Sequence, residues 1–136
     1  MRRWLLDTGI ANDLVNKRDP VESRVRAALA RGDHVGIGTP VLGELSAGIE
    51  NSHSRDQNLL LLNRGLVRLR IWSFDKPAAE EFGRLLAELR RIGSPMQQID
   101  VQIAAIAFAL GNCAVVTKDS DLSRVSNLEV VDWSVA

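Results

Sequence analysis

Four carboxylates are the residues of this sequence best suited to chemistry, because each lies at the edge of an apolar segment. Asp7 follows the apolar run in WLLDTG, and Asp119 follows CAVVT in the segment VVTKDSD. Glu44 lies within TPVLGELSAG, and Asp100 begins the apolar stretch DVQIAAIAFAL. The two histidines and the single cysteine are far apart in sequence, so no zinc-type ligand set accompanies these acids.

The chemistry of the four acids depends on whether they lie together. Carboxylates gathered in one place repel one another strongly unless a cation neutralises them. Oxygen ligands without His or Cys favour Mg²⁺, with Mn²⁺ as the alternative, and such an ion assists cleavage of a phosphodiester. Taken singly, each acid also has an ordinary structural explanation as a turn residue, a first-turn helix acid or a partly exposed helix residue.

Strand-like and helix-like segments alternate along the chain, which predicts a parallel sheet covered by helices. Asp75 is expected to cap a helix that has Pro77 in its first turn, and Gly93 is expected to end it. Ser54 has the spacing of a capping box with the residue three positions on. We expect one α/β domain over residues 1–136. Its predicted strands are 3–7, 34–38, 69–73, 113–117 and 128–132.

This arrangement predicts that the acids converge. In an open parallel sheet, ligands bind at the carboxyl ends of the strands. Asp7 ends the first strand and Asp119 follows the fourth, so both are expected at that edge. Glu44 borders the buried stripe of a helix that begins after the second strand, and Asp100 lies in the first turn of an apolar helix.

Composition limits the other properties of the chain. The 17 basic and 17 acidic residues give a formal net charge of zero, so a polyanion must be bound by local basic patches. No apolar segment is long enough to span a bilayer or form a signal peptide, which favours a cytoplasmic protein without a membrane partner. The single Cys113 fits a reducing compartment. Candidates for a basic rim that contacts the phosphates of a polyanion are Arg2, Arg3, Arg84, Arg90, Arg91, Lys118 and Arg124.

With these residues placed, the chain resembles PIN-domain ribonucleases of the VapC toxin type over essentially its whole length. The segments that carry the resemblance are LLDTG, TPVLGELSAG, GSPMQQIDVQIAAIAFALG, VVTKDSDLSRV and LEVVDW. The resemblance implies a PIN-like three-layer α/β/α fold with about five parallel strands, and an endoribonuclease that depends on Mg²⁺ or Mn²⁺. It also implies a homodimer and a VapB-type antitoxin that blocks the site, with assembly into a toxin–antitoxin hetero-oligomer.

The same resemblance implies the roles of the site residues. Asp7, Glu44, Asp100 and Asp119 match the family's catalytic, metal-binding acidic quartet, Asp121 matches an accessory acidic position, and Thr8 and Thr117 match hydroxyl positions beside the quartet. One departure is Gly9, where the family usually has Asn. That departure supports an alternative interpretation, in which the chain is an RNA-binding or antitoxin-binding module with weak or no catalysis.

Two further alternatives fit fewer residues. LLDTG also resembles the signature of aspartic proteases, but those enzymes need an all-β body, whereas helical periodicity dominates here. A haloacid-dehalogenase-type phosphatase needs a second aspartate two residues after the first, where this chain has Gly9. The four consecutive leucines Leu59–Leu62 indicate either a contact with a partner or second subunit, or a helix buried within the core. An antitoxin groove is expected between the helices at 10–16 and 41–69.

Overall fold

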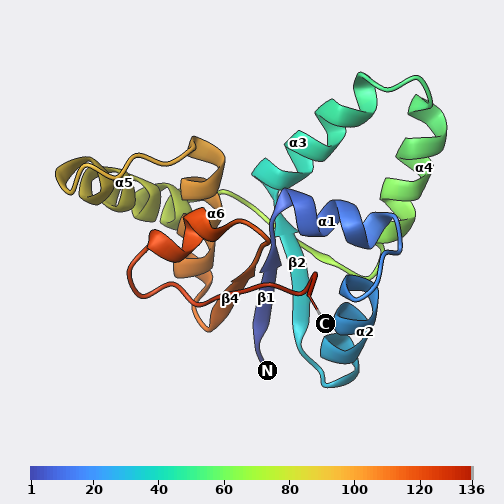
Figure 1. The fold of residues 1–136 in the computed structure, drawn as a ribbon, viewed down its shortest axis with the longest axis horizontal. Coiled ribbons are helices and arrows are strands. Elements are labelled where there is room, and N and C mark those ends of the chain that lie inside the picture. The colour runs from blue at the N-terminus through green and yellow to red at the C-terminus, as the bar shows by residue number, and fades with distance from the viewer. Residues whose placement is uncertain (136) are drawn as a thin grey trace.

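Five parallel strands form the centre of the fold, which the computed structural model describes for residues 1–135 (Figure 1). Their order in the sheet is β3-β2-β1-β4-β5, and every neighbouring pair is parallel. All five predicted strands are present, although the last is shorter than expected. Their bounds are β1 Arg3–Leu6, β2 His34–Gly38, β3 Arg70–Trp72, β4 Cys113–Val116 and β5 Val130–Val131.

Helices cover both faces of the sheet and complete the three-layer α/β/α architecture (Figure 1). The segments that connect β1, β2 and β3 lie on one side, and the segments that connect β3, β4 and β5 lie on the other, as right-handed crossovers require. The helices are α1 Thr8–Val15, α2 Val21–Ala30, α3 Thr39–Glu50, α4 Arg55–Leu66, α5 Lys76–Arg91, α6 Gln98–Leu110 and the short 3₁₀ helix η1 Ser120–Arg124.

The helix signals of α5 act as the sequence predicts. The Asp75 side chain accepts a hydrogen bond from the Ala78 amide at 3.1 Å. At the other end, Gly93 adopts a positive φ of 68° just after the helix, a conformation that glycine allows without strain. At α4 the predicted start is right but the capping box does not form, because the Ser54 side chain makes no capping hydrogen bond.

The leucine run on α4 is only partly buried. Leu62 belongs to the core at 3% exposed, whereas Leu60 and Leu61 are 52% and 38% exposed. A helix buried on all sides is therefore not the explanation for this run, and apolar side chains remain on the surface. No helix within residues 1–135 has the length and apolar character needed to cross a membrane.

Helix α6 lies close against the end of β2. A Cβ atom built on Gly38 would come within 2.6 Å of the Ile106 Cδ1 atom, so a larger residue here would require the Ile106 side chain to move. The facing residues of α6, including Val101 and Ile103, are fully or almost fully buried. Because α6 carries Asp100 in its first turn, this close packing fixes the position of that carboxylate relative to the sheet.

Candidate active site

The strand order reverses between β1 and β4, and the predicted site lies at this point. In open parallel sheets, such a topological switch point at the carboxyl ends of the strands is where ligands bind. Asp7 follows β1, and its amide donates a hydrogen bond to the carbonyl of Val116 at the end of β4, at 3.0 Å. Asp119 comes three residues after Val116, so both strands deliver an acid to the same edge.

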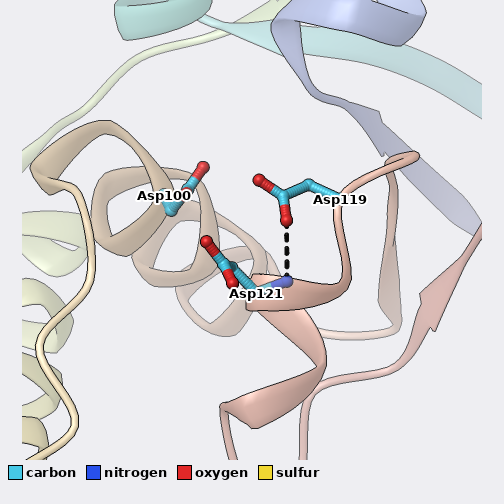
Figure 2. Close-up of side chains that lie close together, drawn as sticks. All are labelled: Asp100, Asp119 and Asp121. Carbon is cyan, nitrogen blue, oxygen red and sulfur yellow. Dashed lines mark hydrogen bonds between the residues drawn. The ribbon is translucent and has the colours of Figure 1, made fainter.

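Three carboxylates come together beside this edge (Figure 2). One carboxylate oxygen each of Asp100, Asp119 and Asp121 lies within 4.8 Å of the other two. Asp119 caps η1, and its Oδ1 atom accepts a hydrogen bond from the Asp121 amide at 2.9 Å. The first turn of α6 supplies the third acid, so a loop and a helix that are distant in sequence form the cluster together.

Asp7 is held rigidly next to this cluster. Its Oδ1 atom caps α1 by accepting from the Ile10 amide at 2.9 Å, and its Oδ2 atom accepts from the Thr117 hydroxyl. The same hydroxyl accepts from the Asp119 amide at 2.9 Å. Burial raises the pKa of Asp7, as does the charge of Asp119, while the hydrogen bonds from Thr117 and Ile10 oppose the shift.

The pKa of Asp100 reflects how closely the acids are grouped. Burial and then the negative charges around it raise the pKa of Asp100 to about 6. The charges that act on it are, in order of effect, those of Asp119, Asp121, Asp7 and Glu44. The other four acids named by the sequence analysis therefore lie within electrostatic range of the Asp100 carboxyl group.

Glu44 takes part from the exposed surface of α3. Its Oε1 atom accepts a hydrogen bond from the Thr8 hydroxyl, which lies in the first turn of α1. The two threonines that the resemblance selects thus have separate partners, Thr8 on Glu44 and Thr117 on Asp7. The structure brings all seven predicted residues into one region of the molecule.

The donor set fits a hard divalent cation. The cluster offers carboxylate oxygens, and burial together with the neighbouring acids raises the pKa of Asp100. Among the described residues, Arg124 is the cation that forms an ion pair with the triplet of Asp100, Asp119 and Asp121, with its guanidinium 3.5 Å from Asp121 Oδ1. Lys118, the next residue along from Thr117, is ion-paired with Asp13 instead.

The predicted basic rim is wrong for Arg2 and Arg3. Both lie at the amino end of β1, whereas the acids lie beyond its carboxyl end. There, Arg2 is ion-paired with Glu129 and Arg3 donates to the carbonyl of Gly111 at 2.9 Å. Sequence proximity to Asp7 is misleading because a strand of four residues separates the two edges of the sheet.

Sequence reasoning missed one buried acid near the site. Asp13 on α1 is 6% exposed and forms ion pairs with Lys118 at 2.7 Å and Arg18 at 3.1 Å. A signal was present, because Asp13 lies three residues after Ile10 and one before Leu14, on the buried stripe of α1. An acid on such a stripe needs a cationic or hydrogen-bonding partner.

A cavity of about 560 Å³ lies beside the acids, between α1, α3 and α4. Glu44 and Thr8 form part of its wall, so the cavity opens next to the candidate site. Its lining matches the helices predicted for an antitoxin groove. The other lining residues are Gly9, Asn12, Val15, Asn16, Leu45, Gly48, Ile49, Asn58, Leu61 and Leu62.

Comparison with known protein families gives a match over most of the chain. The family described as the PIN domain matches residues 4–128 of this chain. A protein of Shigella flexneri named tRNA(fMet)-specific endonuclease VapC is 32% identical over 98% of this chain and 100% of its own length. Ribonuclease VapC2 of Rickettsia felis is 29% identical over 96% of this chain and 97% of its own length.

Solved structures agree with these sequence relationships. The structure of VapBC2 from Rickettsia felis, bound to a DNA fragment from its promoter, superimposes with a TM-score of 0.89 at 29% identity. That match covers 96% of this chain and 98% of the other. DNA-bound VapBC from Salmonella typhimurium matches with a TM-score of 0.88 at 28% identity, over 98% and 99% of the two chains.

Proposed function

Because this chain belongs to the PIN-domain family, we propose that it is a VapC-type endoribonuclease toxin that hydrolyses RNA phosphodiester bonds. The observation that carries the proposal is the grouping of Asp7, Glu44, Asp100 and Asp119 at the switch point, on segments far apart in sequence. Acids placed this way repel one another and destabilise the fold unless a cation neutralises them, which favours a cation-dependent function. The PIN domain is proposed to extend over the whole chain as a single domain.

Asp100, Asp119 and Asp121 are the residues proposed to hold the ion directly, with Asp7 and Glu44 completing the negative site. We propose Mg²⁺ as the ion, with Mn²⁺ as a substitute, because all the donors are oxygens. When bound, a divalent cation supplies charge stabilisation at the scissile phosphate and a more acidic water.

The chain's own residues orient this centre. The Thr117 hydroxyl bonds the Asp7 carboxylate and the Asp119 amide, and Thr8 bonds Glu44. These five residues therefore keep their positions before RNA arrives. Fixed positions reduce the reorganisation needed during reaction. His34 begins β2 at the opposite edge of the sheet, and His53 lies between α3 and α4, outside the acidic site. We therefore propose that a carboxylate, and not an imidazole, accepts the proton that the attacking water loses.

The test of catalysis uses purified protein, Mg²⁺ and transfer RNA. Two relatives are named tRNA(fMet)-specific endonucleases, so tRNA(fMet) is the substrate to try first. Cleavage should require Mg²⁺ and should be lost in Asp7→Ala and in Asp100→Ala, while Asp56→Asn on α4 retains it. Cleavage that persists in EDTA or in Asp100→Ala would refute the metal-dependent mechanism.

A second comparison separates a nuclease from a binding module. If the protein binds Mn²⁺ and RNA but leaves every RNA intact, the module interpretation raised by Gly9 is correct. Mapping RNA 5′ ends in cells after brief induction, with Asp7→Ala as the control, would identify the RNA that is cut. We expect both that RNA and the protein to be located in the cytoplasm.

We propose that a VapB-type antitoxin occupies the cavity between α1, α3 and α4. Glu44 and Thr8 belong both to the cavity wall and to the acidic site, so an occupant would lie against the carboxylates. The exposed Leu61 at its edge offers apolar contact area. By family membership we also expect a homodimer within a toxin–antitoxin hetero-oligomer, which light scattering of the complex would test.

A further inference from the structure

Asp13 is a buried carboxylate that the proposed reaction does not use. With Thr117, it is one of two buried polar or charged residues in the core of the described chain, at 6% exposed. It lies on the apolar stripe of α1, between the N-terminal turn that carries Asp7 and the end of the helix. A carboxylate in such a place costs stability unless cations and hydrogen bonds compensate it.

Two cations compensate Asp13, one at each oxygen. Lys118 Nζ lies 2.7 Å from Oδ2, and Arg18 Nη1 lies 3.1 Å from Oδ1. Burial acts to raise the pKa of Asp13, but the hydrogen bonds and charges of Lys118 and Arg18 outweigh it and lower the pKa. Asp13 therefore remains charged at neutral pH and binds both side chains as an anion.

The two cations differ in what they are attached to. Arg18 belongs to the turn after α1, and its amide also donates to the Asp13 carbonyl at 2.9 Å, so this contact is local. Lys118 lies between Thr117 and Asp119, in the loop that runs from β4 to η1. The ion pair of Lys118 therefore joins the acid-bearing loop to α1, across more than a hundred residues of sequence.

The same loop has a second tie to the start of α1. Thr117 donates to Asp7, and it accepts from the Asp119 amide. Asp121 is in turn linked to Asp119 through a backbone amide at 2.9 Å. Residues 117 to 121 thus rest on α1 at two points, Asp7 and Asp13, and the positions of two clustered acids depend on them.

We propose that Asp13 is a positioning residue for the metal centre, acting through Lys118 to hold residues 117–121 so that Asp119 and Asp121 stay beside Asp100. The inference rests on the proposed function only in naming the ion that these carboxylates hold. Asp13 itself contacts neither the triplet nor Asp7. Its effect is transmitted by the Lys118 ammonium and the backbone on either side of it.

For Lys118, the positioning role and a purely electrostatic role predict changes of opposite sign in cation affinity. Removing a positive charge close to an acidic cluster should strengthen cation binding. Loss of positioning should weaken it, by about tenfold for an outer contact of a metal site. The sign of the change in Mn²⁺ affinity for Lys118→Met therefore distinguishes the two.

The experiment titrates the full chain with Mn²⁺ alone, followed by electron paramagnetic resonance, and measures amide hydrogen exchange of the metal-free protein. Asp13→Asn and Lys118→Met should each weaken Mn²⁺ binding about tenfold and speed exchange at residues 119–121. The double variant should lose little more, and Lys118→Arg should recover most of the affinity. Arg18→Met removes the other ion pair of the same carboxylate and should leave both readouts near wild type.

Specific outcomes overturn the proposal. Tighter Mn²⁺ binding in Lys118→Met with unchanged exchange would show that Lys118 acts only by its charge. If Asp13→Asn binds Mn²⁺ weakly but the double variant with Lys118→Met binds it normally, then Asp13 merely keeps the Lys118 ammonium away from the acids. If Asp13→Asn does not fold, the comparison of Lys118→Met with Lys118→Arg decides. If the wild type binds no Mn²⁺, the metal proposal fails, and hydrogen exchange still tests the positioning role.

Discussion

The Thr117 hydroxyl donates a hydrogen bond to Asp7 Oδ2, which joins the residues that follow β1 and β4 at the switch point of the sheet. The hydroxyl also accepts from the Asp119 amide at 2.9 Å, and the threonine is 2% exposed. One buried side chain therefore sets the spacing between two acids that are 112 positions apart in sequence. Both bonds depend on the oxygen atom and not on the methyl group.

Thr117→Val should preserve the packing of the site, because the two side chains have the same shape, but it removes the two hydrogen bonds that the hydroxyl makes. The Asp7 carboxylate loses a donor and the Asp119 amide loses its acceptor, so unfolding free energy should fall by about 1–3 kcal/mol. RNA cleavage and Mn²⁺ affinity should fall with it, by about tenfold or more. Thr117→Ser, which keeps the hydroxyl, is the control for both measurements. Full activity in the valine variant would show that this hydroxyl does not organise the site.

The stability of the metal-free protein should increase as the pH falls from about 7.5 to about 5.5. Burial and neighbouring acids raise the pKa of Asp100 from 3.8 to about 6, so the folded state takes up a proton that the unfolded state does not. The melting temperature in EDTA should therefore be higher at the lower pH. Asp7, whose pKa is also raised, contributes with the same sign.

Asp100→Asn is the variant that checks this assignment. It should melt at a higher temperature than wild type at neutral pH without metal, and its melting temperature should vary less with pH. Asp56→Asn, whose carboxylate is exposed on α4, should behave as wild type. With Mg²⁺ present the trend should reverse, because protons compete with the metal for the same oxygens. A wild-type melting temperature in EDTA that falls on acidification in this range would contradict the prediction.

Gly9 leaves space next to Asp7 that a side chain could use. A Cβ atom at this position would touch only Asp7 Oδ1, at 3.8 Å, which is an ordinary contact. Gly9→Asn should fold, should gain a few tenths of a kcal/mol from better helix propensity, and should increase cleavage by placing an amide beside the Asp7 carboxylate. Gly9→Ala gives the helix gain alone, about 1 kcal/mol at most. Equal cleavage rates for the two variants would exclude a role for the amide.

Filling the cavity should separate antitoxin binding from catalysis. Gly48 lines the cavity, and no atom lies within 4 Å of the place that a Cβ on this residue would take, so Gly48→Phe should occupy part of the groove without strain. Binding of the cognate antitoxin, measured by calorimetry, should weaken at least tenfold while RNA cleavage continues. Gly83→Phe on α5, an equally open helical glycine away from the cavity, should bind normally. Unchanged antitoxin affinity in Gly48→Phe would place the antitoxin elsewhere.

The sequence predicted the parts of the site that follow directly from strand direction. Asp7 and Asp119 each come after a buried apolar run, and in a parallel sheet such residues meet at one edge. Asp100 was predictable for a different reason, because it is an acid in the first turn of a helix that is otherwise apolar. Glu44 is more exposed than its position beside the buried stripe of α3 suggested, and its hydrogen bond to Thr8 supplies the missing link.

What the sequence did not reveal are contacts between elements. The pairing of Asp13 with Lys118 depends on how α1 lies against the loop after β4, and no local pattern specifies that approach. Arg2 and Arg3 lie at the edge opposite to the one predicted, because their nearness to Asp7 in sequence hides the length of the strand between them. The close seating of α6 on Gly38 is likewise visible only in three dimensions.

The order in which the acids occur along the chain also has a consequence for synthesis. Asp7 leaves the ribosome well before Asp119 and Asp121, because these two follow β4, which must pair with β1 to bring them into place. A growing polypeptide therefore has no complete cutting centre until residue 121 has been translated and the fourth strand has inserted beside the first. The centre proposed for RNA cleavage therefore cannot act beside the ribosome while the segments before β4 are being made.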